Sequence, residues 1–365
     1  MAKHNAENER VKRDYFSFLR EAKGRDTATI DRVAQSLAKF ETSTRHKSFK
    51  KFHKEQAVAF KKGLGEAVSA KSGGKLSKAT VQSTVRDLKA FFEWLSREPG
   101  YRSHLSYSDA DFFNLSEKDA AIARTRREKR VPTLEQVQKV LEAMPAENVL
   151  ERRDRALLAF AAITGARVNA LASFRLGHVD LEERFVDQDA RTVRTKFAKS
   201  FRTYFMPGCE GAEATFAEWV RELREEQLWG PADPLFPAPQ MGLNESGAFQ
   251  AIGLSRDCWG STGPVREVFR KGFAAAGLPY YNPHSFRDML VRHAMKLRLT
   301  PEAMRCWSLN LGHSDVMTTL TSYGHVPTDR RGELIRASAR LTTGDSAIAG
   351  ASSGDLIAEL ARRQQ

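Results

Sequence analysis

The chain has 365 residues, a formal net charge of +13 and 41% hydrophobic residues. This length favours two or three domains, and the hydrophobic content is sufficient for ordinary buried cores. The absence of any run of about 18 apolar residues argues against a membrane-spanning helix. The polar stretch at the N-terminus lacks the apolar segment of a secretory signal. We therefore expect a cytoplasmic protein without a membrane partner.

The positive charge is unevenly distributed along the chain. Nearly all of the excess lies in residues 1–130, and the remainder is close to neutral. A basic module beside a neutral one is typical of a part that grips a polyanion joined to a part with another task. A surface tuned for solubility is the alternative. The three cysteines lie far apart without zinc-binding spacing, so we expect them to be reduced and mostly packing residues.

The first part of the chain is predicted to be a basic bundle of helices. Apolar residues recur at helical spacing over about 30–40, 49–60 and 81–95, with Thr27 or Thr29 as the cap of the first stretch. Cations interspersed there, and in the loop at 71–78, are candidates to contact phosphates: Lys50, Lys51, Lys54, Lys75, Lys78 and Arg86. For any single helix, a solvated lysine face is the alternative.

Residues 117–131 are predicted to be a charged connector. Its segment ARTRREKR holds five cations, among them Arg126 and Arg127, and one acid within eight residues. A basic linker of this kind would allow two domains to close around a polyanion. A simple solvated hinge is the alternative, and both interpretations are compatible.

The second part of the chain is predicted to mix helices with a few strands. Thr133 and Gln136 fit a capping box before an apolar helical pattern. An apolar helix over 154–163 leads into TGAR. We expect a strand at about 184–187 and a hairpin over about 191–206, turning at Phe197-Ala198-Lys199-Ser200. Most of the rest, to about residue 339, is predicted to be helices joined by Pro- and Gly-rich loops.

Six residues suited to attack on a phosphodiester occur in this second part. They are Arg167 in TGARVNAL, Lys196 in VRTKFAKS, His284 and Arg287 in PHSFR, and His313 and Tyr323 in LGHSDVMTTLTSYGHV. Arginine donates two parallel hydrogen bonds to a phosphate and keeps its charge. Histidine exchanges protons near neutral pH. A tyrosine with an ordinary pKa of about 10 needs neighbouring cations and a base to act as a nucleophile.

This set, in this order, resembles the tyrosine recombinase (phage-type integrase) family, in motif detail over roughly residues 130–340. The resemblance implies a mainly α fold with a small antiparallel β-sheet, arranged as a two-domain C-shaped DNA clamp. It assigns 1–116 to a helical core-binding domain, 117–131 to the linker and 132–340 to a mixed α/β catalytic domain. Residues 341–365 would form a tail with a short helix that docks onto another protomer, or a solvent-exposed end.

The resemblance also implies a role for each matching residue. Tyr323 would be the nucleophile, with Tyr204, Tyr280 and Tyr281 as less suitable rivals. Arg167, Arg287 and His313 would bind the phosphate, and His284 would be the general base or its helper. Lys196 would protonate the departing 5′ oxygen, with Lys199 as the alternative or as a further DNA contact. Asp288, where the family often has a basic residue, and RCWSLN before LGH depart from the pattern.

The activity implied is site-specific cutting and rejoining of double-stranded DNA, without metal or ATP, for DNA integration or excision. Four protomers would act on two DNA sites, at the nucleoid, and DNA-bending accessory proteins stay open as further partners. Two alternatives remain. One is a DNA-relaxing enzyme similar to type IB topoisomerases. The other is a non-catalytic DNA-binding accessory protein, against which the intact set of six residues argues.

Overall fold

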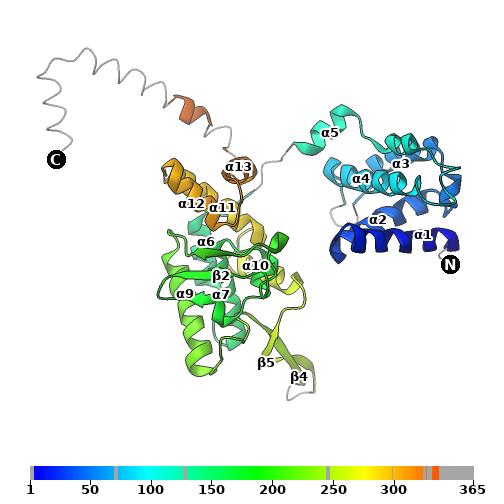
Figure 1. Ribbon diagram of the computed structural model, residues 1–365. Helices are drawn as coiled ribbons and strands as arrows, with labels where there is room; N and C mark the ends of the chain where they lie inside the picture. Colours follow the sequence, from blue (N-terminus) through cyan, green and yellow to red (C-terminus); the bar gives the residue numbers. More distant parts are fainter. Residues whose placement is uncertain are drawn as a thin grey trace, which may run out of the picture. The chain divides into compact units, whose positions relative to one another are not determined.

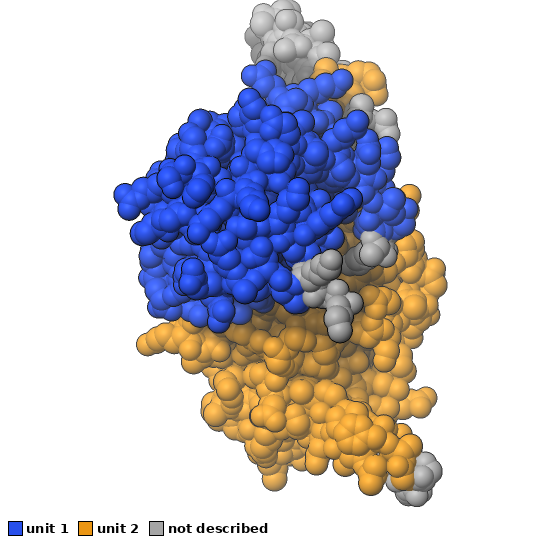
Figure 2. All heavy atoms as spheres, turned by 90° about the vertical axis from the view of Figure 1, so that its right-hand side faces the viewer, with its two compact units in different colours: residues 1–127 blue, residues 128–365 orange. Residues whose placement is uncertain are grey.

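The computed structural model describes residues 4–69, 73–125, 130–243, 247–297, 299–323, 326 and 331–336. The chain divides into two compact units, Met1–Arg127 and Glu128–Gln365 (Figure 2). Over the described residues the fold is mainly helical with two small antiparallel sheets, which confirms the predicted fold class. None of the described helices is both long and apolar enough to span a membrane.

Over its described residues, the first unit is built from helices and an isolated bridge (Figure 1). Its elements are α1 (Ala6–Ser17), η1 (Phe18–Ala22), α2 (Thr27–Ser43), η2 (Phe49–Lys51), α3 (Lys54–Glu66), α4 (Lys78–Leu95), η3 (Tyr107–Phe113) and α5 (Glu117–Arg124). The helical stretches predicted from the sequence are thus confirmed. The predicted cap of α2 is wrong, because the carboxylate of Asp26 accepts from the backbone N–H of Thr29.

Aromatic rings fill the core of the first unit. Phe40, Phe92 and Phe113 are mutual neighbours with ring centroids 5.4 to 5.6 Å apart. Beside this core lies a paired ionic network: the buried Asp87 accepts from Arg32 Nη1 at 2.7 Å and from Ser36 Oγ at 2.9 Å. The network joins α2 to α4.

The predicted linker begins as a helix in the structure. Residues 117–124 form α5, which Lys78 ties to the start of α4 through an ion pair with Asp119 at 2.8 Å. Arg126, Arg127 and the predicted tail 341–365 lie outside the described residues. The domain limits taken from the family resemblance therefore stay a prediction.

The second unit surrounds one large hydrophobic core. Its first elements are α6 (Leu134–Ala143), α7 (Val149–Thr164), α8 (Val168–Leu171), η4 (Leu176–His178), β1 (Val179–Asp180), β2 (Phe185–Gln188), η5 (Lys196–Ala198) and β3 (Phe201–Tyr204). Then come α9 (Glu210–Arg221), η6 (Glu222–Glu226), β4 (Pro237–Leu243), β5 (Phe249–Cys258), α10 (Gly263–Ala275), α11 (Pro283–Lys296), α12 (Pro301–Asn310), α13 (Val316–Thr318) and η7 (Thr319–Tyr323). The capping box of Thr133 and Gln136 is confirmed at α6.

The three-stranded sheet has the order β1-β2-β3, with both pairs antiparallel. The hairpin predicted over 191–206 is wrong in its first arm, because β3 pairs with β2 and residues 189–200 form the connecting loop. Asp189 starts that loop: its side chain and its carbonyl accept backbone N–H groups of Arg191 and Val193. These turn bonds lead the chain out of the sheet.

The second sheet was not expected from the sequence. Strands β4 and β5 form an antiparallel ribbon, with Leu243 opposite Phe249, that extends away from the rest of the unit (Figure 1). Pro237 and Pro239 in β4 argued against a strand in the sequence, since proline cannot donate a hydrogen bond to a neighbouring strand. A two-stranded ribbon tolerates them because each strand has one unpaired edge.

Candidate active site

The first part of the site is the turn that ends α7. Gly165 caps the helix in a left-handed conformation, with φ of 59°, and Arg167 follows as the N-cap residue of α8, half-buried. A Cβ atom at Gly165 would lie 2.9 Å from Leu311 Cδ2 and 3.0 Å from Leu290 Cδ1. The turn therefore needs glycine both for its backbone angle and for space.

The second part is α11, which begins with Pro283 at a position that suits proline. His284 is exposed, whereas the Arg287 side chain is only 1% exposed. Arg287 Nη1 donates to the carbonyl of Gly165 at 2.7 Å, and Nη2 donates to the carbonyl of Leu311. The guanidinium thus ties together the ends of α7 and α12.

The third part is the turn that follows α12. Gly312 has a φ of 68°, and a Cβ atom there would collide with the ring of Phe201. Asn310, the last residue of α12, accepts from the backbone N–H of Tyr204 at 2.7 Å and donates to its carbonyl at 2.9 Å. Strand β3 therefore holds this turn, and His313 after it, in place.

His313 is where these parts meet. Its ring is 4% exposed, and its Nε2 lies 2.9 Å from Arg287 Nη2. Burial, followed by electrostatic interactions with Arg287, Arg167, His284 and Lys199, lowers the pKa of His313 to about 3. Four of the residues singled out in the sequence thus act electrostatically on His313.

A small hollow opens beside His313. It has a volume of about 240 Å³ and is lined by residues of the β2–β3 loop and of the LGH turn, including Lys199, Phe201 and Gly312. Lys196 is exposed and begins η5 in the same loop. The sequence analysis favoured Lys196 and kept Lys199 as the alternative, and Lys199 is the one that lines this hollow.

Tyr323 is the last residue of η7, a π-helical turn that packs against α11 and α13. Such turns are rare and occur frequently at functional sites. The structure therefore brings the segment of Tyr323 to the helix that carries His284 and Arg287.

Three polar residues of this site were missed in the sequence: Ser308, Asn310 and Thr319. Ser308 and Thr319 are fully buried, and Asn310 binds an exposed strand edge. Serine and threonine beside a glycine turn are ordinary in sequence, so no pattern marked them. Their burial depends on contacts with residues far away in the chain.

The candidate phosphate contacts of the first unit differ in their surroundings. The Nζ atom of Lys50 lies 2.6 Å from Oε1 of Glu7. Lys78 forms an ion pair with Asp119, and the ammonium group of Lys54 lies over the ring of Phe112. Lys51, Lys75 and Arg86 are exposed. The exposed cations are better placed than the paired ones to exchange water for phosphate.

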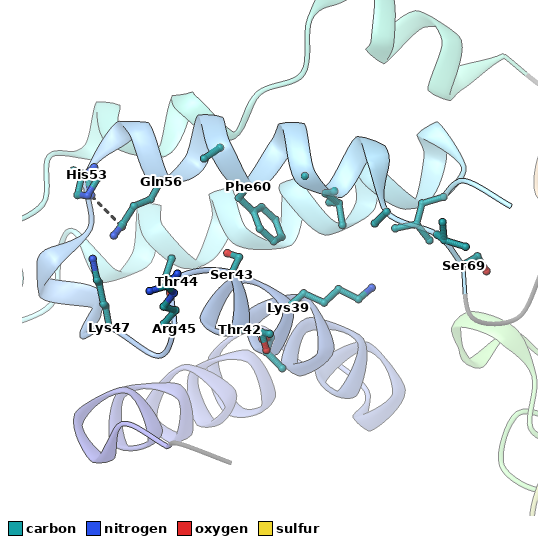
Figure 3. Close-up of a pocket in the computed structure, with 17 residues that line it drawn as sticks. Lys39, Thr42, Ser43, Thr44, Arg45, Lys47, His53, Gln56, Phe60 and Ser69 are labelled. Carbon is teal, nitrogen blue, oxygen red and sulfur yellow. Dashed lines mark hydrogen bonds between the residues drawn. The ribbon is translucent and has the colours of Figure 1, made fainter. Parts of the chain in front are cut away.

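The first unit also has a hollow of about 960 Å³ between the end of α2 and α3 (Figure 3). Lys39, Arg45 and Lys47 line it, and Phe60 lies in its apolar part. Although it is larger than the hollow beside His313, its lining residues include none of the six singled out for phosphodiester chemistry. We take the smaller hollow as the candidate active site because His313 and Lys199 line it and Arg287 contacts His313.

Sequence and structure comparisons give a consistent result. No family model matches the chain. Tyrosine recombinase XerD of Neisseria meningitidis is 28% identical over 207 residues, which are 54% of this chain and 60% of that protein. Tyrosine recombinase XerC of Xylella fastidiosa is 23% identical over 314 residues, which are 84% of this chain and 89% of that protein. The chain is similar in sequence to these tyrosine recombinases.

The fold agrees with this relationship. The crystal structure of a lambda integrase dimer bound to a core site superimposes with a TM-score of 0.57 at 14% identity, covering 86% of this chain and 94% of that one. The resemblance to tyrosine recombinases and integrases inferred from the motifs is thereby confirmed. The similarities are thus to enzymes of the tyrosine recombinase class.

Proposed function

We propose that this chain cuts and rejoins double-stranded DNA at specific sites through a 3′-phosphotyrosyl intermediate. The observation that carries the proposal is the convergence of Arg167, His284, Arg287 and Lys199 on the buried His313. These residues come from several segments of the chain between residues 167 and 313. The positive charges of Arg167, Arg287 and Lys199 suit a phosphate anion, and η7, which ends at Tyr323, packs against α11.

In the first step, the Tyr323 hydroxyl oxygen attacks the scissile phosphorus. The bond from phosphorus to the 5′ oxygen breaks as the bond to tyrosine forms. His284, exposed at the start of α11, accepts the phenolic proton. Lys196, or Lys199 from the same loop, donates a proton to the departing 5′ oxygen.

Negative charge grows on the non-bridging oxygens during this step, so fixed cations lower its barrier. Arg167 offers its guanidinium from the half-buried start of α8. Arg287 is held by two carbonyls, which fixes its charge before the DNA arrives. A bound phosphate would compete with His313 Nε2 for Arg287 Nη2, and the histidine would then turn from acceptor to donor by gaining a proton.

Rejoining is the reverse of cleavage with a different strand. A 5′ hydroxyl from the partner DNA attacks the phosphotyrosyl phosphorus, and Tyr323 leaves and regains its proton. The bond energy is kept in the intermediate, so the exchange does not consume ATP. By analogy with the related recombinases, we expect integration or excision of DNA as the overall outcome.

The basic first unit would supply DNA affinity. Lys51, Lys75 and Arg86 are exposed on it, and Arg126 and Arg127 belong to the proposed linker. We expect the two domains to close around the duplex as a clamp, with four protomers on two DNA sites, in the cytoplasm at the nucleoid. The proposed domain limits are 1–116, 117–131, 132–340 and 341–365.

The test is a trapping assay with a nicked suicide substrate taken from DNA flanking the gene. We expect the wild type, without metal or ATP, to form a protein–DNA adduct that survives denaturant. Tyr323→Phe should bind the same DNA and form none, because it lacks the attacking oxygen. An adduct in Tyr323→Phe would contradict the assigned nucleophile.

The two alternatives give different results in the same preparation. A topoisomerase-like enzyme would relax supercoiled plasmid of arbitrary sequence as fast as plasmid carrying the flanking site. A non-catalytic protein would bind DNA tightly and yield no adduct with any substrate.

A further inference from the structure

The imidazole of His313 has a hydrogen-bond partner on each nitrogen. Nε2 lies 2.9 Å from Arg287 Nη2, and Nδ1 lies 2.7 Å from the hydroxyl of Thr319. A guanidinium only donates hydrogen bonds, so Nε2 is the acceptor. The single proton of the neutral ring is therefore on Nδ1 and is donated to Thr319.

A second hydroxyl continues this chain. The Thr319 hydroxyl donates to Ser308 Oγ at 2.7 Å, and the Ser308 carbonyl accepts from the backbone N–H of His313 at 3.1 Å. Thr319 is 0% exposed and Ser308 is 1% exposed. Both hydroxyls are removed from water, so each depends on the other groups of the chain for its hydrogen bonds.

Thr319 also has a special place in the chain. It is the first residue of η7, and Tyr323 is the last. Its hydroxyl thus fixes the start of the turn to α12, through Ser308, and to the LGH turn, through His313. One side chain joins the histidine to the segment of the proposed nucleophile.

We infer that Thr319 is a positioning residue for the proposed strand cleavage, acting through His313 and supported by Ser308. The inference rests on the proposed function. Arg287 sets the tautomer of His313, and the Thr319 hydroxyl accepts the Nδ1 proton and keeps the ring in one orientation, with Nε2 facing the arginine and the phosphate. A histidine whose far nitrogen has a fixed partner is oriented for its task, as in other sites where a third group holds the base.

The inference predicts a specific loss when the hydroxyl is removed. Thr319→Val is nearly isosteric and leaves the buried Nδ1–H without its acceptor, whereas Thr319→Ser keeps the hydroxyl. We expect adduct formation to fall by about 10- to 100-fold in Thr319→Val, the range found for outer partners of functional histidines. Thr319→Ser should restore most of the rate, and Ser308→Ala should give a smaller loss.

The matched control is Thr321→Val. It is the same substitution in the same turn, but Thr321 is exposed and its hydroxyl donates to the carbonyl of Met317 at 2.6 Å. We expect the rate of this variant to equal that of the wild type. A loss in Thr321→Val as large as in Thr319→Val would show that the turn is merely sensitive to valine, and would overturn the inference.

A second measurement does not depend on cleavage. Nitrogen-15 spectra of imidazole-labelled full-length protein, without DNA, report which nitrogen of each histidine carries the proton. The His313 signals are identified by their loss in His313→Gln. Because Arg287 faces Nε2, we expect Nδ1 to be protonated in the wild type, Thr319→Ser and Thr319→Val. The Nδ1 signal should shift in Thr319→Val, which loses the hydrogen bond to Thr319, and should stay in place in Thr319→Ser.

The outcomes separate the inference from the proposed function. Wild-type spectra with the proton on Nε2, or an unchanged Nδ1 signal and rate in Thr319→Val, would overturn the inference. If the rate of adduct formation falls as far in Thr319→Ser as in Thr319→Val, Thr319 has a packing role instead. If the wild type forms no adduct on any DNA while Thr319→Val still shifts the Nδ1 signal of His313, the proposed function fails and the link from Thr319 to His313 stands.

Discussion

The two units differ in the charges that lie next to their buried polar groups. In the first unit the buried Asp87 lies against Arg32, so the network neutralises itself and fastens α2 to α4. In the second unit the buried His313 is acted on by cations, foremost Arg287. In an ion pair each charge already has its counter-charge, whereas a cluster of positive charges is stabilised when an anion binds. The sign of the surrounding charge separates a structural network from a candidate binding site.

The strongest test of this contrast is Arg287→Ala. Removing one fixed donor of charge at a reacting centre slows the chemical step by about 100- to 1,000-fold, or roughly 2.7–4 kcal/mol. We expect a loss of at least this size in single-turnover adduct formation, and the same direction for Arg167→Ala. Near-normal cleavage in Arg287→Ala would show that Arg287 has no role in cleavage, and Arg287 would then be a structural residue like Arg32.

The packing of the second unit is tested by Gly165→Ala against Gly277→Ala. Both glycines have left-handed backbones, with φ of 59° and 66°, but a Cβ at Gly277 meets nothing within 4 Å. Each variant has a backbone cost of about 1–2 kcal/mol. The free energy of unfolding of Gly165→Ala should fall by about 1–3 kcal/mol more than that of Gly277→Ala, because the new methyl group overpacks Leu311 and Leu290. Equal free energies of unfolding in urea would show that the α7 turn is not tightly packed.

The self-neutralised network is tested by Asp87→Ala. The variant leaves Arg32 and Ser36 without their buried acceptor, which should lower the free energy of unfolding by about 1–3 kcal/mol. The rate of adduct formation per folded molecule should not change. A slower rate at unchanged stability would mean that this network serves the reaction, contrary to the comparison.

The smallest expected effect concerns the exposed cations of the first unit. If Lys51 and Arg86 each contact a phosphate, Lys51→Gln and Arg86→Gln should each lower the slope of log K against log salt by about 0.9. Lys50→Gln should change it less, since Lys50 already pairs with Glu7. Fluorescence anisotropy with duplex DNA at several salt concentrations measures these slopes. Slopes equal to that of the wild type in all variants would indicate that the DNA contacts are made by other residues.

The helices were predictable where one face is apolar. Ile30, Val33, Leu37 and Phe40 recur at helical spacing, and all four are buried in α2. The ribbon of β4 and β5 was not predictable, because its prolines and glycines are typical of loops and its register contains bulges. Local propensity fails where an element is stabilised by pairing rather than by an amphipathic face.

The candidate site was predictable in its charged residues and not in its buried hydroxyls. Arg287 and His313 stand in recognisable motifs, and the structure places them 2.9 Å apart. Thr319 and Ser308 have no such signal. Their role arises from burial and from hydrogen bonds between α12 and η7 that only the folded chain creates.

The most direct test of the account is to identify the amino acid that becomes attached to DNA. The wild-type adduct, trapped on the nicked substrate, is digested with trypsin and nuclease and sequenced by mass spectrometry. The account predicts a nucleotide on Tyr323 alone. A nucleotide on another residue, such as Tyr204, Tyr280 or Tyr281, would contradict it.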